Sequence, residues 1–443
     1  MKAINEAIKK HEKLILDAER YIWANPETGY KEFKTSAYMA ENFRKLGYEL
    51  TMAEGITGFT AELDTGRDGP TILILGEIDS VICPTHPECD PETGAVHSCG
   101  HNAQCAALLG IAAALKEDGV CDGLSGKIRL CAVPAEELLE IEYRTELRSK
   151  GVIKYFGGKS EFLSRGLFDG VDIAFMVHTG SRFLIRGGSV GCIAKSITYK
   201  GKAAHAGGEP EAGINALYAA SCGLNAVNAI RETFIDEEYI RVHPIITSGG
   251  CMVNAIPDTA TLESYVRGKT YEAMVRENKK VNRALVGAAL SLGANVEIVD
   301  SPGYAPLNND YNMMLLAKDA IELALPGTPY FFLEENFSKG STDMGDLSCI
   351  MPVVHPYCAG YVGTGHGSDF YITDPMAACV DSARWQLCML KLLLQNGAER
   401  ANNIIKEFKP LFATKEDYLA YIEDIRICGD RIIYTDEGAS VKL

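Results

Sequence analysis

Metal-binding side chains stand close together at the start of residues 97–115, HSCGHNAQCAALLGIAAAL. Cys99 and His101 are separated by one residue and run into small apolar residues that predict a buried helix. Upstream, residues 71–79 (TILILGEID) predict an interior strand that ends in Asp79. A thiolate and an imidazole at this spacing, with carboxylates just before them, are typical ligands of a soft-to-borderline divalent metal. The alternative is that Cys99 is a small buried side chain and His101 a hydrogen-bonded core histidine.

Further potential ligands follow two other predicted strands. Residues 127–133 (KIRLCAV) predict a strand that stops at a proline, and Glu136 and Glu137 come just past its end. Residues 171–178 (VDIAFMVH) predict a strand that ends in His178. Because the carboxyl ends of strands in an α/β sheet line one crevice, we expect all these groups to lie close together.

The adjacent acids Glu136 and Glu137 are suited to two different tasks. On a regular strand they would point to opposite faces, but a turn past the strand end can aim both into the crevice. Adjacent carboxylates repel each other unless a cation lies beside them. A metal would let one glutamate coordinate and leave the other free as a base. The alternative is a pair of solvated surface acids.

The other histidines differ in how well their surroundings suit a metal. His366 stands in a Gly-rich turn (GTGHG), where the backbone can approach an ion, and His355 (VVHPY) is its rival, although a core position is favoured for it. His97 is favoured as a neighbour of the ligands rather than as a ligand itself. His205 (KAAHAGGEP) belongs to a second predicted domain, from which it could reach the site only across a cleft.

Composition limits the class of protein. The 443 residues are 47% hydrophobic and carry a formal net charge of −16, which argues against a nucleic-acid partner because phosphate binding needs clustered Lys and Arg. No apolar run approaches the roughly 20 residues that span a bilayer, and the N-terminal segment lacks the apolar stretch of a signal peptide. The 14 cysteines form no CxxC pair and are expected to be reduced thiols. We therefore expect a cytoplasmic protein with no membrane partner.

One cysteine-containing segment leaves two interpretations open. Cys83, His86 and Cys89 lie in CPTHPECDP and could form a separate structural zinc site. The Pro-rich setting favours an ordinary loop instead.

The order of predicted elements indicates two α/β domains, one inserted into the other. Residues 1–188 and 301–443 form the first domain, whose N-terminal residues 4–46 predict a helix pair broken at Asn25–Pro26, with an N-cap at Thr35 or Ser36. Residues 189–300 form the insertion, whose βαββαβ order is that of a ferredoxin-like sandwich. Its predicted strands and helices are residues 192–200, 214–230, 240–247, 259–267, 271–292 and 295–299.

Taken together, the motifs resemble a known family over essentially the whole chain. They are NPETGYKEFKTS, GEIDSV, HSCGHN, PAEE, FMVH, GKAAHAGGEPEAGINAL, NAIPD and GTGHG. The family is that of the co-catalytic metallohydrolases, which includes aminoacylases, hippurate hydrolase, auxin-conjugate amidohydrolases and related carboxypeptidases and dipeptidases. GHN in place of the commoner GHD, together with RVHPIITSGGCMVNAIPD and GSTDMGD, resembles the branch of aminobenzoyl-glutamate utilisation protein B and β-alanyl dipeptidase-type relatives.

This resemblance implies a mixed-sheet α/β metallopeptidase domain that binds two divalent ions, zinc or manganese, with an inserted ferredoxin-like domain for dimerisation and closure over the substrate. By position, it implies metal ligands at Cys99, His101, Glu137, His178 and His366. It implies Glu136 as the general base and Asp79 as the acid that orients a ligand or the metal pair. From the inserted domain it implies His205, often contributed by the partner subunit, and Asn254 as a substrate contact.

The function implied is hydrolysis of the amide bond of N-acyl or N-aroyl amino acids such as aminobenzoyl-glutamate, by a homodimer. A dipeptidase acting on β-alanyl or other small dipeptides is the alternative, and a non-catalytic metal-binding scaffold is a third possibility. Arg182, Arg186 and Arg267 are candidate partners for a substrate carboxylate, although solvated arginines are common.

Overall fold

The computed structural model describes all residues from Met1 to Leu443, and they form two compact units. Unit 1 consists of Met1–Gly188, Leu307–Phe337 and Thr342–Lys415. Unit 2 consists of Ser189–Pro306, Ser338–Ser341 and Glu416–Leu443. Residues 301–306, 338–341 and 416–443 therefore lie in unit 2, whereas the sequence predicts that residues 301–443 all belong with the first domain. For the last of these segments, the backbone contacts described below give the reason. No helix combines the length and the apolar character that crossing a membrane requires.

A six-stranded mixed sheet forms the centre of unit 1. Its middle strand, β3 (Thr71–Glu77), is buried along its whole length and runs parallel to β6 (Lys127–Val133) on one side and β7 (Ile173–Phe175) on the other. This explains the continuous apolar run of TILIL, because a parallel strand covered on both faces has no solvent-facing side. The order is β1-β2-β6-β3-β7-β17, in which the outer strands are β1 (Leu50–Met52), β2 (Phe59–Asp64) and β17 (Val353–Val354).

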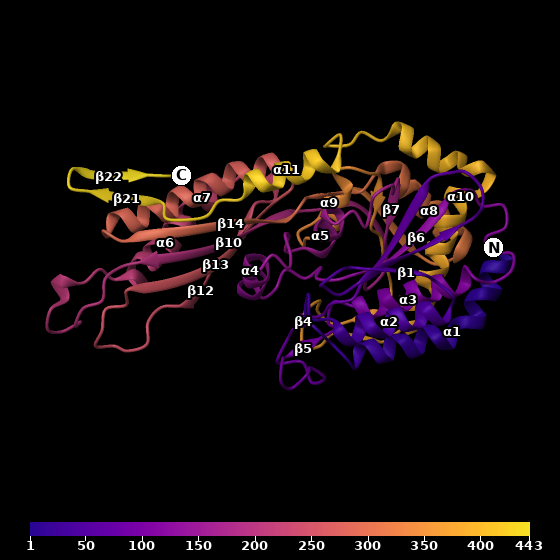
Figure 1. Ribbon diagram of the computed structural model, residues 1–443, viewed down its shortest axis with the longest axis horizontal. Helices are drawn as coiled ribbons and strands as arrows, with labels where there is room; N and C mark the ends of the chain where they lie inside the picture. Colours follow the sequence, from indigo (N-terminus) through magenta and orange to yellow (C-terminus); the bar gives the residue numbers. More distant parts are fainter. The chain divides into compact units, whose positions relative to one another are not determined.

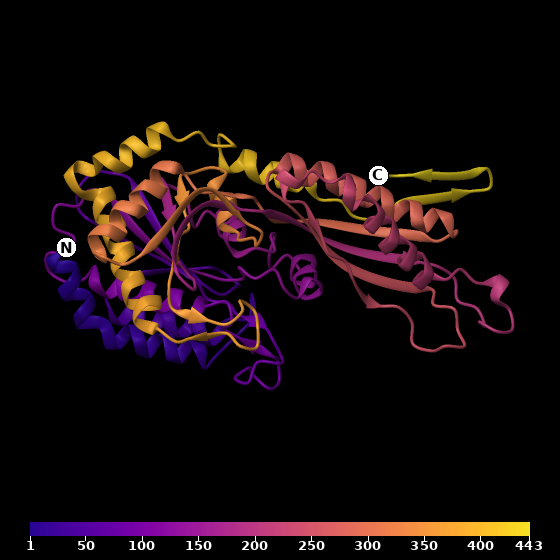
Figure 2. The ribbon, with the colours of Figure 1, turned by 180° about the vertical axis from the view of Figure 1, so that it is seen from behind.

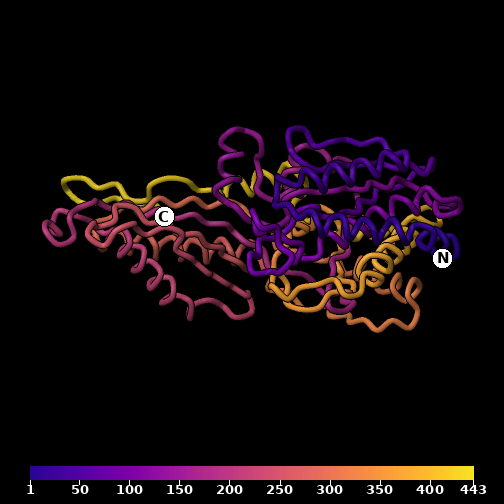
Figure 3. Tube along the Cα trace, turned by 90° about the horizontal axis from the view of Figure 1, so that it is seen from below, coloured from indigo at the N-terminus to yellow at the C-terminus, as the bar shows by residue number.

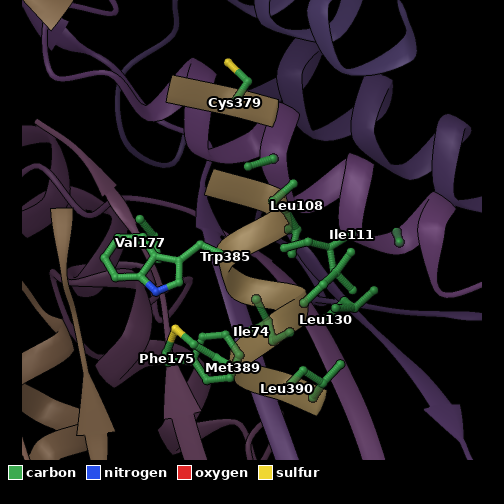
Figure 4. Packing of buried hydrophobic residues seen from close by; sticks show 14 of the residues in the cluster. Ile74, Leu108, Ile111, Leu130, Phe175, Val177, Cys379, Trp385, Met389 and Leu390 are labelled. Carbon is green, nitrogen blue, oxygen red and sulfur yellow. The ribbon is translucent and has the colours of Figure 1, made fainter. Parts of the chain in front are cut away.

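Helices pack against this sheet, among them α3 (His101–Ala114), in which every residue is buried. A helix that is apolar on all sides must be enclosed. It packs against β3, α1 (Lys2–Trp23) and α10 (Ser382–Glu407). Figure 4 shows Leu108 and Ile111 of α3 beside strand residues and the α10 residues that include Trp385.

The N-terminal helix pair is present, but the second helix begins earlier than predicted. Helix α2 (Phe33–Lys45) starts after Glu32, not after Thr35 or Ser36. The reason is that the carboxylate of Glu27 accepts hydrogen bonds from the backbone N–H groups of Lys34 and Thr35, at 2.8 and 3.0 Å. The carboxylate of Glu27, in the segment just before the helix, therefore supplies the cap that the sequence predicts from a hydroxyl.

The predicted strand of residues 171–178 is divided between two sheets. Its second part, β8 (His178–Thr179), belongs to a sheet of unit 1 in which it runs parallel to β18 (Tyr357–Cys358). The other strands of this sheet are β9 (Phe183–Ser189), β15 (Leu307–Asn308) and β16 (Tyr330–Ser338). The remaining elements of unit 1 are α4 (Ile141–Ser149), α5 (Gly158–Ser164), α8 (Tyr311–Ala324), α9 (Met344–Ser348), β4 (Val81–Ile82), β5 (Ala95–Val96), β19 (Tyr361–Val362) and β20 (Tyr371–Ile372).

Unit 2 is built on an antiparallel sheet with two helices, α6 (Ala216–Ile230) and α7 (Tyr271–Ser291), which pack on each other and on the sheet (Figure 2). The strand order is β11-β13-β10-β14, with β12 also paired to β13. The strands are β10 (Gly191–Lys200), β11 (Arg241–Val242), β12 (Ile245–Ser248), β13 (Thr259–Gly268) and β14 (Asn295–Tyr304). This is the βαββαβ order that the sequence predicts, except that the second strand is interrupted at a proline, which lacks the N–H for the ladder.

The C-terminal segment lies along the β14 edge of this sheet (Figures 1 and 3). After α11 (Lys415–Ile425), bridges join Ile427 to Asp300 and Asp430 to Glu297. The segment ends in the hairpin of β21 (Ile432–Thr435) and β22 (Gly438–Val441). These backbone contacts place the segment in unit 2 and cover an edge that would otherwise expose unpaired N–H and C=O groups.

Candidate metal centre

Potential metal ligands gather where β3 and β6 end and where α3 begins. Three groups of three ligand atoms occur in which all atoms lie within 4.8 Å of one another. These groups are Cys99, His101 and His178; Cys99, Glu137 and His366; and Glu77, His101 and Glu136. Because Cys99 and His101 each belong to two groups, the three form one continuous cluster. The structure thus brings together all five side chains that the resemblance implies as ligands.

The His101 ring is oriented with one nitrogen available. It is the first residue of α3, and its Nδ1 lies 3.0 Å from the backbone carbonyl oxygen of Asp79. A carbonyl can only accept, so Nδ1 carries a proton and Nε2 is the nitrogen left to face an ion. Nε2 is buried and has no hydrogen-bond partner. A buried imidazole nitrogen in this state fits a metal ion, since an unsatisfied polar atom is otherwise costly.

His178 is held in the same way by its own strand. Its Nδ1 donates to the carbonyl oxygen of Thr179 at 2.8 Å, and its Nε2 faces Cys99 Sγ at 3.6 Å. Gly100 precedes α3 in a left-handed conformation (φ 89°) that favours glycine, and a Cβ there would lie only 3.0 Å from Thr179 Cβ. Although burial opposes the thiolate, His101 and His178 lower the pKa of Cys99 to about 6. Cys99 can therefore supply the thiolate that metals bind.

The second group is assembled from a strand end and a distant loop. Glu137 Oε1 lies 3.1 Å from Nε2 of His366, which has a left-handed backbone (φ 62°) between two glycines and donates its N–H to Ser98. Hydrogen bonds that the His366 ring donates to Cys99 and Glu137 raise the pKa of His366 to about 11. The anionic neighbours that favour a proton there would favour a divalent cation for the same electrostatic reason.

Both glutamates reach the cluster because the chain turns just past β6. Ala135 adopts a left-handed conformation (φ 55°), which breaks the strand alternation before Glu136 and Glu137. Glu136 Oε2 lies 3.9 Å from His101 Nε2. Burial, and then the charges of Glu77 and Glu137, raise the pKa of Glu136 well above its ordinary value. A carboxylate with a raised pKa is able to accept and return a proton near neutral pH.

Three charged residues beside the ligand cluster were not singled out by the sequence patterns: Glu77, Lys159 and Asp343. All three are fully buried, and Lys159 contacts both carboxylates. Glu77 could have been found, since it stands two residues before Asp79 on the predicted strand. No local pattern around Lys159 or Asp343 indicates that they meet, because 184 positions separate them.

The predicted substrate residues lie in unit 2. His205 and Asn254 are neighbours there, since His205 forms a bridge with Ala255 and Asn254 accepts the N–H of Ala206 at 3.0 Å. Both side chains are exposed. His205 Nδ1 accepts N–H groups of the Gly-rich turn that follows, from Gly208 at 3.0 Å. Their roles remain predictions.

Two alternative metal positions are disfavoured by the contacts. His86 uses both ring nitrogens, one with the Phe370 carbonyl at 2.9 Å and one with the Glu88 N–H at 3.1 Å, so the loop interpretation of its segment is favoured. His355 is buried with its ring 5.6 Å from that of His178, and it belongs to none of the three groups. His366 therefore fits the last ligand position better than His355 does.

Comparison with known proteins agrees with this geometry. Residues 73–390 match the model of Peptidase family M20/M25/M40. The chain is 27% identical over 357 residues to indole-3-acetyl-aspartic acid hydrolase of Enterobacter agglomerans, covering 67% of this chain and 76% of that protein. It is 29% identical over 328 residues to N-acetyl-L-cysteine deacetylase of Bacillus subtilis (strain 168), covering 71% of this chain and 73% of that protein.

Solved structures share the fold. One is a dinuclear metal-binding peptidase of the M20 family from Bacillus subtilis, with a TM-score of 0.64 and 22% identity over 87% of this chain and 99% of that one. Another is the aminobenzoyl-glutamate utilization protein of Klebsiella pneumoniae, with a TM-score of 0.65 and 20% identity over 87% and 98%. The predicted fold class and resemblance are confirmed. Because the family match spans every member of the three ligand groups, the chain belongs to peptidase family M20/M25/M40, whose members hydrolyse C–N amide bonds.

Proposed function

We propose that the protein hydrolyses the amide bond of N-acyl or N-aroyl amino acids with two bound divalent ions. The observation that carries the proposal is the pair of ligand groups that share Cys99, each completed by different side chains. Relatives named for amide hydrolysis of acyl amino acids support the substrate class. The thiolate and imidazoles suit zinc, and the carboxylates suit manganese as well.

In this proposal Cys99, His101 and His178 hold one ion, and Cys99, Glu137 and His366 hold the other. Divalent ions in such sites lower the pKa of a water molecule to about 7 and polarise a substrate carbonyl. Glu136 takes a proton from the attacking water as the new C–O bond forms. It then passes this proton to the amine nitrogen as the C–N bond breaks, which releases an amino acid and a carboxylic acid.

Asp79 is proposed to position the ligands rather than to react. Its carbonyl oxygen holds His101 Nδ1 at 3.0 Å, and its carboxylate accepts the backbone N–H of Glu137 at 2.8 Å. We infer that His205 and Asn254 contact the substrate, with His205 supplied by the partner subunit of a homodimer.

A cationic cavity in unit 2 has side chains suited to binding a carboxylate. The cavity has a volume of about 360 Å³ and is lined by Arg241, His243, Tyr265, Arg267 and Lys339. Guanidinium groups bind carboxylates in a bidentate manner, and the overall charge of −16 makes a local excess of cations notable. Arg182 and Arg186 contact the aromatic rings of Phe331 and Tyr357 and are weaker candidates for this role.

The homodimer is proposed to form through the open edge of the unit 2 sheet. All residues of β12 are exposed, including Ile245 and Ile246. The opposite edge, at β14, is covered by the C-terminal segment. An exposed apolar edge strand is a template for pairing with another chain.

A cytoplasmic location is proposed from the reduced state expected of the cysteines.

The test is amine release from a panel of acyl amino acids and dipeptides, with metal-stripped protein reloaded with zinc or manganese. Turnover of aroyl-glutamate or other acyl amino acids is the expected result. Cleavage of β-alanyl or other free-amine dipeptides alone would replace the proposal with a dipeptidase. No turnover on the whole panel with two ions bound would contradict the proposed substrate class and favour the scaffold.

A further inference from the structure

A buried lysine joins two acids next to the proposed metal centre. Lys159, in α5, has its Nζ 2.5 Å from Glu77 Oε1 and also contacts Asp343 Oδ1. The backbone N–H of Lys159 donates to the other oxygen of Asp343 at 2.9 Å. All three side chains are fully inaccessible to solvent. Glu77 lies in the motif GEIDSV and Asp343 lies in the motif GSTDMGD. The proposed mechanism gives neither acid a role.

The second oxygen of Glu77 faces the donor cluster. Oε2 accepts a hydrogen bond from Gln104 Nε2 at 2.9 Å and lies 3.2 Å from His101 Nε2. The thiol of Cys105 donates to the Glu77 carbonyl oxygen at 2.9 Å, which fixes the backbone as well. Glu77 is therefore held from several directions, and its carboxylate is in contact with a proposed metal-binding ring.

By distance alone, Glu77 belongs to a third possible ion site with His101 and Glu136. Its hydrogen bonds argue against that use. One carboxylate oxygen is paired with an ammonium group and the other with an amide N–H. A divalent ion bound to Glu77 would lie close to the Lys159 ammonium, and two cations at that separation repel strongly in a buried site. By contrast, the carboxylate of Glu137 pairs with His366 and not with a lysine or arginine.

A buried cation is favourable at the position of Lys159 because several buried acids surround it. Burial of a carboxylate is costly unless a cation and hydrogen bonds compensate its charge. Lys159 supplies one positive charge to Glu77 and Asp343 together. Lys159 thus compensates the negative charge of Glu77 beside the metal ligands, so that no metal ion is needed for that purpose.

We propose that Lys159 is a positioning residue that pairs with Glu77 and thereby holds the Glu77 carboxylate beside the donor cluster instead of leaving it free to bind an ion. Of the three groups, only the two that contain Cys99 then bind ions. This inference rests on the proposed two-ion centre and adds the residues that fix its ligand geometry. Asp343 anchors the lysine from a distant part of unit 1.

The test compares metal binding by the wild type, Glu77→Gln and Lys159→Met. Lys195→Met is the matched control, because Lys195 is also fully buried and paired with an acid, Asp300, but lies in unit 2. Ion stoichiometry is measured by elemental analysis at saturating zinc. Zinc affinity is measured by competition with a chelator, and ligand geometry by the visible absorption of the Co²⁺-substituted protein.

The wild type is expected to bind two ions per chain. Glu77→Gln should still bind two at saturation, with one ion bound about 10–100-fold more weakly and a shifted Co²⁺ spectrum, as for other changes to residues that support metal ligands. Lys159→Met should change affinity and spectrum in the same direction. Lys195→Met should lower the melting temperature and leave zinc affinity and spectrum unchanged.

Complete loss of one ion in Glu77→Gln would identify Glu77 as a ligand and overturn the inference. Wild-type affinity and spectrum in Glu77→Gln would overturn it as well. If Lys159→Met does not fold, the near-isosteric Glu77→Gln variant decides alone. A wild type that binds fewer than two ions would instead contradict the proposed two-ion centre, so failure of that proposal is distinguishable from failure of this inference.

Discussion

The carboxylate of Asp79 accepts a hydrogen bond from the backbone N–H of Glu137, with an N···Oδ2 distance of 2.8 Å. The same residue holds His101 through its carbonyl oxygen. Asp79 thus connects the ends of β3 and β6 and links ligands of both proposed ion sites. One residue fixes two ligands because the carboxyl ends of parallel neighbouring strands meet at one edge of the sheet.

Replacement of Asp79 should therefore weaken both ion sites. Asp79→Ala is expected to lower zinc affinity about 10–100-fold, because the ligands lose a hydrogen-bonded support. Asp79→Asn keeps an accepting oxygen and should retain more affinity than Asp79→Ala. The measurement is chelator competition, with the exposed Asp64→Ala as control. Equal affinity of Asp79→Ala and wild type would contradict the role.

Replacement of Glu136 should separate catalysis from metal binding. Glu136→Ala is expected to reduce turnover by about 10²–10⁴-fold, the usual contribution of general acid–base catalysis, while metal content stays close to that of the wild type. Activity and elemental analysis on the same preparation check this result. Glu142→Ala, an exposed acid in the first turn of α4, is the control. More than about 10% residual activity in Glu136→Ala would exclude Glu136 as the base.

Removal of the Cys99 thiolate should affect both ions, since this residue belongs to both groups. Cys99→Ala is expected to show reduced zinc content after dialysis and to lose the sulfur-to-Co²⁺ charge-transfer absorption. Cys192→Ala, a buried thiol in β10, should keep both properties. Unchanged metal content in Cys99→Ala would remove Cys99 from the ligand set.

Two buried histidines should make the metal-free protein unstable to acid. Burial lowers the pKa of His97 and of His355 to about 3. In the unfolded chain these histidines have a pKa of about 6.5, so between about pH 6.5 and pH 3 they bind protons that they do not bind in the folded chain. The free energy of unfolding therefore falls as the pH drops below about 6.5 and continues to fall towards pH 3. At pH 4.5 each of the two histidines should lower the free energy of unfolding by about 2–3 kcal/mol relative to neutral pH.

Urea unfolding at pH 7.5 and pH 4.5, with a chelator present, measures this loss. His97→Gln should show a smaller loss between the two pH values than the wild type. The exposed His243→Gln should show the wild-type loss. If His97→Gln were as sensitive to acid as the wild type, the neutral buried state of His97 would be ruled out.

A charge on β12 should disrupt the proposed homodimer. Ile246→Glu is expected to raise the dimer dissociation constant at least about tenfold, since a charge on the paired edge opposes strand addition. Sedimentation velocity measures the change, and Ile433→Glu, on the exposed C-terminal hairpin, should leave the dimer intact. A fully active monomeric wild type would exclude a contribution of His205 from a partner subunit.

The sequence alone predicts which side chains gather at the candidate metal centre and which strands carry them. Strand β6 has the predicted bounds, and Cys99, His101, Glu137, His178 and His366 lie within the ligand groups. These features are local, because a buried strand shows as an apolar run in the sequence and the ligand at its end follows that run directly. The functional roles of His205 and Asn254 stay predictions.

Tertiary structure decided what depends on distant partners. The C-terminal segment joins unit 2 through backbone bridges to β14. The Glu77–Lys159–Asp343 ion pairs bring together residues from three separated segments. No local pattern encodes such contacts, because a buried lysine is compatible with its position only once two acids from elsewhere in the chain compensate its charge.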